Sequence, residues 1–479
     1  MLLMSTTDDL LPSNLLTKRF PFKPTASQAR FFEKMNNFLV EEEGLERYRD
    51  AFVLKGYAGT GKTTIISALI KSARSLGIKA VLLAPTGRAA KVMSSYSKRK
   101  ALTIHKKIYR QTSDAYSGAF AFERQDNYHE DTLFIVDEAS MISDDSDFGN
   151  RSLLADLVDY IYSNPGNKLM LVGDIAQLPP VRKEISPALD KSYLEKNYYL
   201  SVSEEELTEV MRQGEESGIL SNATELRNQL AAANPEIKIS TKKFTDIYRM
   251  TGEKLEDGLR YAYDKYGVEN TIIITRSNKT AVNYNEYIRR TINFSEDELD
   301  AGDRLMVVRN NYTVLDEESP VGFIANGDFV ELLKLKRTEE IHGLRFADAV
   351  LRLTDYDEQP EFEAKIMLDT LHSSSPALSQ EENKMLYESV MQDYFYIKSK
   401  KERAEAIRKD PYMNALQIKF AYALTCHKSQ GGQWSAVFVD QGYLPPEQVN
   451  NEFIRWLYTA MTRATDELFL MNFQPNFFA

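Results

Sequence analysis

The chain has 479 residues, of which 43% are hydrophobic and 27% are charged, and its formal net charge is −11. This length is too great for one ordinary core and predicts roughly three or four globular domains. No run of about 18 apolar residues is present, so we expect no membrane-spanning helix. Cys426 is the single cysteine, which excludes an internal disulfide, and the N-terminus turns acidic too early for a signal peptide. These features favour the cytoplasm.

A basic stripe interrupts this acidic chain between Ala84 and Ser113, where no Asp or Glu occurs. Its cationic residues are Arg88, Lys91, Lys98, Arg99, Lys100, Lys106, Lys107 and Arg110. The overall negative charge argues against a protein coated in nucleic acid, whereas one basic stripe is typical of a protein that holds phosphates in a defined groove. A solvated helix face is the alternative interpretation.

The stretch Gly56–Thr63 matches the phosphate-binding pattern G-x-x-x-x-G-K-[ST], between an apolar strand-like run and an amphipathic helix. Its glycines allow consecutive N–H groups to face phosphates beside a helix N-terminus, which favours anions. Lys62 is expected to reach the β- and γ-phosphates, and the Thr63 hydroxyl to ligate Mg²⁺. A chance glycine-rich turn is the alternative. The residues predicted to hold a nucleoside triphosphate here are Gly56, Gly59, Thr60, Gly61, Lys62, Thr63 and Thr64.

A later hydrophobic run, Thr132–Val136, ends in the two carboxylates Asp137 and Glu138. Asp137 is suited to hold Mg²⁺ through water, and Glu138 is suited to orient or deprotonate an attacking water. A helix N-cap is the alternative for this pair, and the phosphate loop favours the nucleotide site over it. Gln177 follows the next strand-like run and could detect the γ-phosphate.

Strand and helix patterns alternate over most of the chain and predict two doubly wound α/β halves with parallel sheets. A β-hairpin is expected around the turn-rich residues 112–118. Short strand-like runs interrupt the second half and predict a small β-barrel followed by a charged helical stretch. The predicted organisation is a leader at 1–23, a first α/β domain at 24–195 with a hairpin insertion at about 100–128, a second α/β domain at 196–300 and 411–479, and a barrel with a helical extension at 301–410.

Ten sequence blocks occur in an order that resembles superfamily 1B DNA helicases of the RecD/Dda branch. The resemblance covers nearly all of residues 24–475, and its most specific blocks are Asp137–Ser140, Gly173–Val181 and His427–Gly431. It implies two RecA-like domains, an inserted SH3-like barrel, and hydrolysis of ATP with Mg²⁺. It also implies translocation from 5′ to 3′ on single-stranded DNA, unwinding at junctions with duplex, and roles in repair, recombination or replication. We expect the protein to act as a monomer.

The resemblance assigns roles to residues of the nucleotide site. Gln28 would read adenine, and Gln177 would couple the γ-phosphate to domain motion. Arg212 and Arg463 would be arginine fingers, each commonly worth roughly 10³ to 10⁵ in rate. A surface ion pair is the alternative for either arginine. The expected catalytic residues are Lys62, Glu138, Gln177, Arg212 and Arg463, and the expected metal ligands are Thr63 and Asp137.

Each α/β half is also expected to grip single-stranded DNA, mainly through phosphate contacts that any sequence offers. The expected contacts are Pro85, Thr86, Arg88, His105 and Lys106 in the first half, and Thr275, Asn278, Thr425, His427 and Lys428 in the second. In the hairpin, Tyr116, Phe120 and Phe122 could stack on the first unpaired base and wedge the duplex open. These aromatic residues could instead pack the hairpin onto its own domain.

Two other functions remain open from the sequence. One is an ATP-driven motor on RNA, because related superfamily 1 enzymes share these motifs. The other is an ATP-gated nucleic-acid-binding subunit that separates no strands. A nuclease is disfavoured, because no further carboxylate cluster with metal-site spacing accompanies Asp137 and Glu138.

Overall fold

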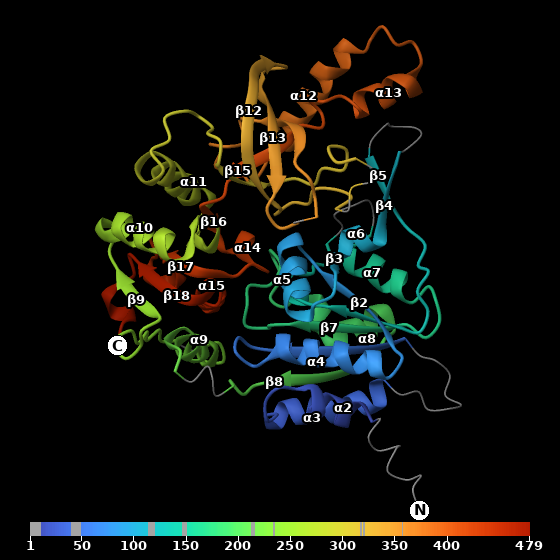
Figure 1. The fold of residues 1–479 in the computed structure, drawn as a ribbon, viewed down its shortest axis with the longest axis vertical. Helices are drawn as coiled ribbons and strands as arrows, with labels where there is room; N and C mark the ends of the chain where they lie inside the picture. Colours follow the sequence, from blue (N-terminus) through green and yellow to red (C-terminus); the bar gives the residue numbers. More distant parts are fainter. Residues whose placement is uncertain are drawn as a thin grey trace, which may run out of the picture.

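Two α/β domains and a β-barrel make up the molecule, with the barrel above the α/β domains in Figure 1. The computed structural model describes residues 11–39, 49–113, 120–145, 151–211, 216–232, 235–316, 319, 321–356 and 358–479. No helix within these ranges is long and apolar enough to cross a membrane.

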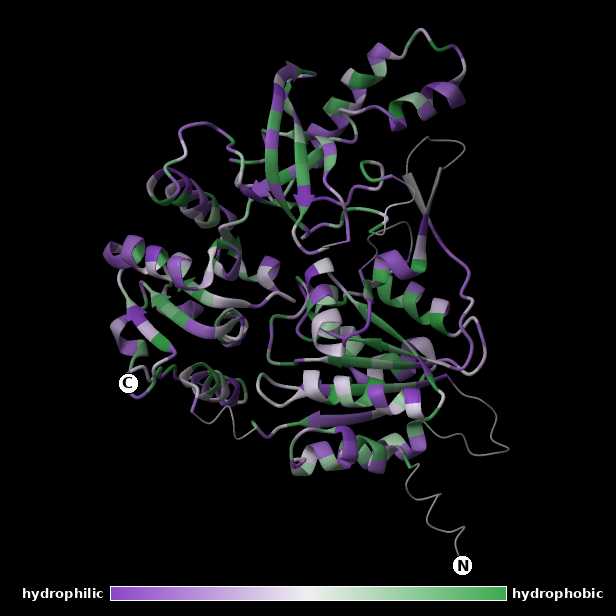
Figure 2. Ribbon diagram, viewed as in Figure 1, coloured by the Kyte–Doolittle hydropathy of each residue, from purple (hydrophilic) through white to green (hydrophobic). Residues whose placement is uncertain are grey.

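The first domain is built on a six-stranded sheet with the order β3-β2-β6-β7-β1-β8, in which every neighbouring pair is parallel. Its strands are β1 (Asp50–Gly56), β2 (Lys79–Ala84), β3 (Ala101–Thr103), β6 (Thr132–Val136), β7 (Lys168–Gly173) and β8 (Ser201–Leu207). The central strands read as apolar runs because helices cover both faces of a parallel sheet, and they appear green in Figure 2. The predicted doubly wound α/β architecture is confirmed.

The helices of this domain begin where the sequence offers side-chain caps. Thr86, Thr103 and Ser152 each accept a hydrogen bond from a backbone N–H in the first turn of the helix that follows. The helices are α3 (Ala26–Leu39), α4 (Lys62–Ser75), α5 (Gly87–Ser97), α6 (Ile104–Ile108), η1 (Ala139–Met141), α7 (Leu153–Ile161), η2 (Pro187–Leu189) and α8 (Lys191–Tyr198).

The first domain extends beyond its predicted limits at both ends. Helix α2 (Pro12–Arg19) lies in the predicted leader, and Leu16 and Phe20 are buried against the domain. The ring centroids of Phe20 and Phe32 lie 5.5 Å apart, so this segment packs against the first domain. At the other end, β8 pairs in parallel with β1 and belongs to the first sheet, although the predicted boundary at residue 195 placed it in the second domain.

Strands β4 (Tyr109–Ser113) and β5 (Phe120–Arg124) form the predicted antiparallel hairpin, with Tyr109 paired to Arg124. The turn at 114–119 lies outside the described residues, and so does Tyr116. The side chains of residues 111–122, including Phe120 and Phe122, are also outside the description. The wedge and its packing alternative therefore both stay predictions.

The second domain is built on a five-stranded parallel sheet with the order β16-β10-β17-β18-β9. Its strands are β9 (Ile247–Met250), β10 (Thr271–Thr275), β16 (Ala423–Thr425), β17 (Trp434–Asp440) and β18 (Ala464–Met471). Its helices are α9 (Gly218–Gln229), η4 (Gly252–Lys254), α10 (Leu255–Tyr266), η5 (Val268–Asn270), α11 (Asn278–Tyr287), η6 (Ile288–Ile292), α14 (Cys426–Ser429), η7 (Pro446–Gln448), α15 (Asn451–Met461) and η8 (Pro475–Phe477).

The expected barrel is present as a closed ring of five strands. These are β11 (Arg304–Val307), β12 (Phe329–Ile341), β13 (Leu344–Leu353), β14 (Phe362–Met367) and β15 (Leu416–Phe420), and the helical extension is α12 (Gln380–Asp393) and α13 (Lys400–Arg408). Strand β15 lies beyond the predicted boundary at residue 410. The apolar run at 416–424 therefore divides, giving one strand to the barrel and the next, β16, to the second sheet.

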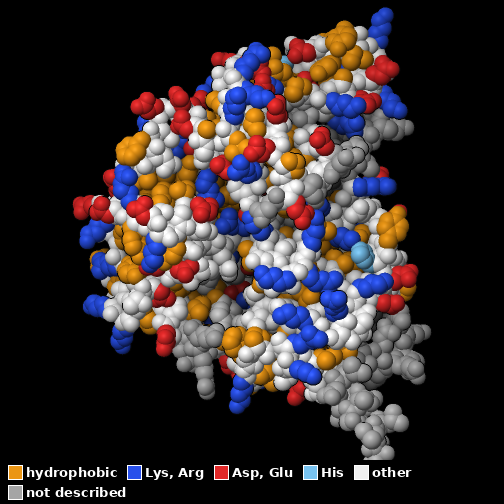
Figure 3. Space-filling model, viewed as in Figure 1, with side chains coloured by type: hydrophobic (Ala, Val, Ile, Leu, Met, Phe, Trp, Pro, Cys, Tyr) orange, Lys and Arg blue, Asp and Glu red, His pale blue; other side chains and the backbone are white. Residues whose placement is uncertain are grey.

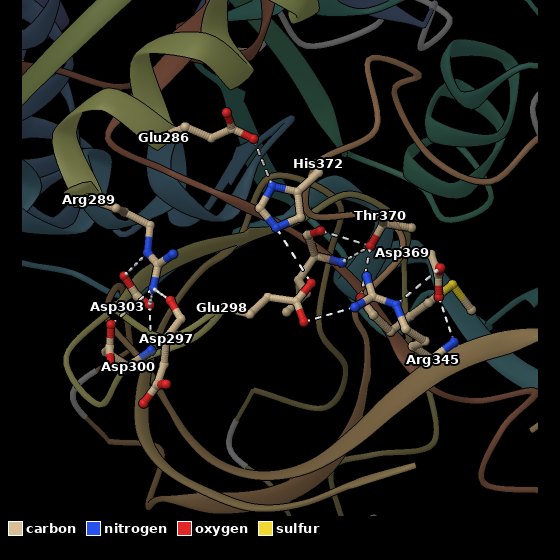
Figure 4. Close-up of polar contacts among 12 residues, drawn as sticks. Glu286, Arg289, Asp297, Glu298, Asp300, Asp303, Arg345, Asp369, Thr370 and His372 are labelled. Atoms are coloured by element: carbon tan, nitrogen blue, oxygen red, sulfur yellow. Dashed lines mark hydrogen bonds and ion pairs between the residues drawn. The ribbon is translucent and has the colours of Figure 1, made fainter. Parts of the chain in front are cut away.

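A network of charged side chains anchors the barrel on the second domain (Figure 4). The buried guanidinium of Arg289 binds both carboxylate oxygens of Asp303, at 2.9 and 2.8 Å. Beside it, His372 bonds Glu286 of α11 at 3.0 Å, and Arg345 of the barrel bonds Glu298 at 2.9 Å. The barrel is thus fixed to the second domain by polar contacts as well as by its two chain connections.

Candidate functional site

The phosphate loop joins β1 to helix α4 at the carboxyl edge of the first sheet. Gly59 and Gly61 have φ of +75° and +86°, a backbone conformation that glycine adopts without the strain other residues suffer. Gly61 is the N-cap of α4, so the loop ends where free backbone N–H groups favour an anion. Thr63 is exposed in the first turn, with Thr64 half-buried beside it.

Lys62 is folded back onto the phosphate loop. Its Nζ donates to the carbonyl oxygens of Gly56 at 2.6 Å and Tyr57 at 2.9 Å. It also lies 4.0 Å from Oδ2 of the buried Asp174, which follows β7 at the same edge of the sheet. The ammonium group therefore lies where loop, carboxylate and a bound phosphate would compete for it.

Gln28, the predicted adenine reader, is fully buried against the phosphate loop. Its Nε2 donates to the carbonyl oxygen of Thr60 at 2.9 Å, and its Oε1 accepts from the backbone N–H of Thr25 at 2.9 Å. Both ends of the amide are used within the chain in this conformation. Adenine recognition by Gln28 stays a prediction.

Asp137 and Glu138 follow β6 directly, at the same edge as the phosphate loop. Tyr96 donates to Oδ2 of Asp137 at 2.7 Å, and the backbone N–H of Glu138 donates to Oδ1 at 2.9 Å. Burial raises the pKa of Glu138, while the positive charges of Arg463 and Lys62 oppose that rise. Glu138 therefore feels cations from both α/β domains.

Arg463 lies just beyond α15 in the second domain and is 3% exposed. Its Nε donates to the carbonyl of Thr459 at 3.1 Å, and its Nη1 to the carbonyl of Gly432 at 3.3 Å. Both partners belong to its own domain. The other predicted finger, Arg212, lies outside the described residues, so its role stays a prediction.

Helix α15 reaches across to the segment Asp174–Leu178 of the first domain, a contact that we call the seam. Thr459 accepts from the backbone N–H of Leu178 at 2.8 Å, and Arg455 donates to the carbonyl of Ile175. Gln177 lies within this segment, 5% exposed, and its Oε1 has no hydrogen-bond partner in the described structure. The predicted γ-phosphate detector thus carries a free acceptor at the domain boundary.

The sequence interpretation missed Asp174 and the α15 residues of the seam. The signals were available, because Asp174 follows a strand in the manner of Asp137. Tyr458 and Thr459 lie in the same block as Arg463. Parallel strands deliver their following residues to one edge, which brings such acids together.

A groove of about 700 Å³ lies between the first domain and the barrel. Pro85, Thr86 and His105, three of the predicted DNA contacts, line its first-domain wall. The barrel wall was not predicted and includes Arg309, Asn310, Tyr312 and Asn326. Tyr312 stacks on Phe323 with ring centroids 4.7 Å apart. An aromatic ring among amides and an arginine suits contact with bases and phosphates.

Two other predicted DNA contacts, Arg88 and Thr275, make their contacts within the protein. Arg88 lies between the rings of Trp434 and Phe329, with its guanidinium carbon 4.1 and 4.9 Å from their centroids. Thr275 is fully buried and donates to the carbonyl of Ser277 at 3.0 Å. Arg88 joins the first domain to the second domain and the barrel, and Thr275 offers no surface to DNA in this conformation.

His105 and Lys106 share helix α6 but face different hollows. His105 lines the groove, and burial lowers its pKa to about 4, so the imidazole is neutral at pH 7. Lys106 instead lines a neighbouring hollow of about 350 Å³ between α5 and the barrel, where burial lowers its pKa to about 8. The visible face of the first domain carries many Lys and Arg side chains around this region (Figure 3).

The four remaining predicted contacts lie on the second domain, and none of them lines the groove in the described structure. Asn278 begins α11, and Thr425 precedes the short helix α14 that carries His427 and Lys428. Burial lowers the pKa of Lys428 to about 8. These residues stay predicted contacts on a separate surface.

Comparison with known proteins gives two family matches. The model of an AAA domain matches residues 42–241, and that of a UvrD-like helicase C-terminal domain matches residues 420–471. The chain is 38% identical to the ATP-dependent RecD2 DNA helicase of Deinococcus radiodurans over 132 residues, which are 27% of this chain and 16% of that protein. It is 25% identical to the ATP-dependent DNA helicase dda of Enterobacteria phage T4 over 318 residues, which are 63% of this chain and 67% of that protein.

A solved structure is similar over a larger share of the chain. The Pif1 helicase from Bacteroides, in complex with ADP-AlF3 and single-stranded DNA, matches with a TM-score of 0.45 and 17% identity, covering 93% of each chain.

A phosphate loop at the edge of one parallel sheet, facing a second parallel sheet, defines a P-loop nucleoside triphosphatase with two RecA-like domains. The sequence matches narrow the class. The chain combines an AAA domain with a UvrD-like helicase C-terminal domain, and parts of it are similar in sequence to the RecD2 and Dda DNA helicases.

Proposed function

We propose that this chain is an ATP-dependent DNA helicase that moves from 5′ to 3′ on single-stranded DNA and separates duplex at junctions. The observation that carries the proposal is the contact between the two RecA-like domains beside the phosphate loop, where Thr459 and Arg455 of α15 bind the Asp174–Leu178 segment. Lys62 and Glu138 lie in the first domain, and Arg463, which follows α15 in the second, opposes the rise in the pKa of Glu138. Such a divided site links hydrolysis to domain motion.

The first-domain residues of this site fit a magnesium nucleotide. The left-handed glycines form the phosphate cradle, Lys62 supplies a cation, and Gln177 offers an unpaired acceptor. Among the described residues no group of three or more His, Cys, Asp and Glu could hold a metal alone. Thr63 and Asp137 would therefore share Mg²⁺ with water and nucleotide oxygens, as Mg²⁺ prefers. When bound, the metal would neutralise charge on the phosphates.

The groove between first domain and barrel is the proposed path of the single strand. Pro85, Thr86 and His105 would hold it from one side. Tyr312 and the neighbouring asparagines would hold it from the barrel, which we propose is SH3-like and arches over the strand. A neutral His105 offers stacking and hydrogen bonding without charge, which suits contacts that must be released at every step.

Direction, monomeric action and a cytoplasmic location are further parts of the proposal. The direction follows from the RecD and Dda resemblance, and the location follows from the single cysteine. An RNA-directed motor and a binding subunit without unwinding are the competing functions, because both would use the same nucleotide site.

Strand displacement on matched forks tests the proposal. The enzyme is mixed with Mg²⁺-ATP and duplexes of one sequence that carry either a 5′ or a 3′ single-stranded tail, with Glu138→Gln as the inactive control. We expect displacement of the 5′-tailed duplex alone. Displacement from the 3′ tail would overturn the direction, and stimulated hydrolysis without displacement would favour the binding subunit. Stronger stimulation by tailed RNA than by DNA would favour the RNA motor.

A further inference from the structure

One buried tyrosine hydroxyl connects the two RecA-like domains at the nucleotide site. Tyr458 lies on α15 of the second domain and is 1% exposed. Its hydroxyl donates to Oδ2 of Asp174 at 2.7 Å and accepts from the backbone N–H of Ala58, within the phosphate loop, at 2.8 Å. A single oxygen atom therefore joins α15 to the phosphate loop and to the end of β7.

Asp174 extends this connection to the phosphate-binding lysine. The carboxylate is 1% exposed, and its Oδ1 accepts from the backbone N–H of Ala176 at 2.9 Å. Its Oδ2, which binds the tyrosine hydroxyl, lies 4.0 Å from Nζ of Lys62. Any phosphate that draws Lys62 away from its loop carbonyls therefore changes the electrostatic surroundings of the acceptor that holds Tyr458.

Tyr458 differs from its neighbours on the same face of α15. Arg455 and Thr459, at helical spacing from one another, have their described first-domain partners within the Asp174–Leu178 segment. Tyr458 also binds the phosphate loop itself. Arg463 follows at the C-terminal end of the same helix, so a shift of Tyr458 along or around the helix axis moves the predicted arginine finger with it.

We propose that Tyr458 is a positioning residue that couples occupation of the phosphate loop to the placement of Arg463. The inference rests on the proposed ATP hydrolysis at this domain contact. The hydroxyl performs no chemistry. It keeps α15 in register with the loop through Ala58 and Asp174, and it passes a displacement of Lys62 to the second domain.

The substitution Tyr458→Phe isolates this role. The ring keeps its packing with Ala176 and Ala223, and only the hydroxyl is removed. The backbone N–H of Ala58 and one oxygen of Asp174 then lose a buried partner, which is costly for polar groups away from water. The change acts on the link between the domains and leaves Lys62, Glu138 and Arg463 in the chain.

Tyr422→Phe is a closely matched control. Tyr422 is also buried, its hydroxyl donates to Oδ1 of Asp303 at 2.9 Å, and it accepts from the backbone N–H of Arg304 at 3.2 Å. The same pair of hydrogen bonds, to an aspartate and a backbone amide, is thus lost at the base of the barrel. Because each substitution removes one hydroxyl with the same kinds of partner, Tyr458→Phe and Tyr422→Phe should lower the thermal midpoint of unfolding by similar amounts.

Two readouts distinguish positioning from stability. The first is the kcat and KM for ATP with saturating single-stranded oligonucleotide. The second is intrinsic fluorescence during titration with Mg²⁺ and the non-hydrolysable analogue AMP-PNP. The chain has only two tryptophans, Trp434 and Trp456, both in the second domain, and Trp456 lies two residues before Tyr458 on α15. Fluorescence thus reports on the second domain, through Trp456 on α15 and Trp434 on β17, without hydrolysis.

We expect Tyr458→Phe to lower kcat about tenfold with KM changed by no more than about twofold, and to lose most of the fluorescence response. Tyr422→Phe should match the wild type in both readouts. The inference is overturned if Tyr458→Phe keeps the wild-type kcat and response, or if Tyr422→Phe loses them equally. A wild type that hydrolyses no ATP would sink the proposed function alone, because the fluorescence comparison still decides the coupling.

Discussion

Two of the contacts between the first RecA-like domain and the rest of the molecule differ in character. At the seam, single side chains of α15 form hydrogen bonds with Asp174–Leu178. Tyr458 of the same helix also binds the phosphate loop. At the second contact, which we call the clasp, barrel residues Asp328 and Tyr356 press onto Gly87 at the start of α5. A Cβ atom at Gly87 would lie 2.2 Å from Oδ1 of Asp328 and 2.3 Å from the Tyr356 hydroxyl.

The difference indicates which contact opens during a cycle. Individual hydrogen bonds contribute about 1 kcal/mol each and can be exchanged for bonds to water or ligand, so the seam can open and close. The clasp leaves no room for a side chain at Gly87, so opening it would give up close packing that individual exchanges of hydrogen bonds do not restore. We infer that nucleotide acts on the seam while the clasp keeps the barrel over the groove.

The largest effect is expected from a change at Glu138, in the nucleotide site of the first domain. Glu138→Gln removes the carboxylate that would orient or deprotonate water while keeping its size, and should lower kcat roughly 10²- to 10⁴-fold. The affinity for AMP-PNP should change little, because Lys62 and the loop remain. Steady-state hydrolysis and analogue titration measure the two quantities. A variant with near wild-type kcat would assign the water-activating role elsewhere.

A smaller effect is expected when the clasp is forced apart. Gly87→Ala introduces the Cβ that Asp328 and Tyr356 exclude, and such overpacking costs about 1–3 kcal/mol. If the clasp closes the groove, dissociation from a single-stranded oligonucleotide should accelerate up to about 100-fold. Gly252→Ala is the control, because the nearest atom to its Cβ would lie at an ordinary 3.4 Å. Equal dissociation rates in both variants would show that the clasp does not hold DNA in the groove.

The barrel wall of the groove should contribute a moderate share of DNA affinity. Tyr312→Ala removes a ring that can stack on a base, an interaction of about 1–3 kcal/mol, and should weaken single-strand binding about tenfold. Tyr128→Ala provides the comparison, because Tyr128 is 87% exposed and does not line the groove in the described structure. Fluorescence anisotropy with a labelled oligonucleotide measures both. Unchanged binding by Tyr312→Ala would place the strand outside this groove.

The smallest effect concerns pH and the clasp. Burial raises the pKa of Asp328 from 3.8 to about 7, against opposition from the positive charge of nearby Lys106, with Asp355 and Tyr356 also facing the group. Because the folded state favours the protonated carboxyl, this stabilisation is full below pH 4 and is lost as the pH rises towards 7. Asp328→Asn should therefore gain thermal stability relative to wild type between pH 5 and pH 8. A difference in thermal stability between Asp328→Asn and the wild type that stays constant with pH would contradict the raised pKa of Asp328.

The sequence predicted what local pattern determines. Apolar runs and the glycine–lysine spacing identified two parallel-sheet domains and the phosphate loop, because strand period and loop geometry are encoded within a few residues. Domain edges were less accurate. Strands β8 and β15 each lie next to a predicted boundary, and only their pairing partners, distant in sequence, decide which sheet they join.

Side-chain partners were the hardest to predict. Arg88 was predicted to contact DNA because of its charge. Its guanidinium instead stacks on the rings of Trp434 and Phe329, which are hundreds of residues away in sequence. Tyr458 reads as an apolar position of a helix, and its bond to Ala58 exists only because two domains meet. Interdomain contacts of this kind leave no periodic signal in a single sequence.

The most direct test is a structure of the chain with Mg²⁺, a γ-phosphate mimic and single-stranded DNA. We predict that the guanidinium of Arg463 leaves the carbonyls of Thr459 and Gly432 and lies roughly 2.7–3.1 Å from the mimic held by Lys62. Arg463 still bonded to those carbonyls, with no group of the second domain at the mimic, would contradict a nucleotide site shared between the two domains.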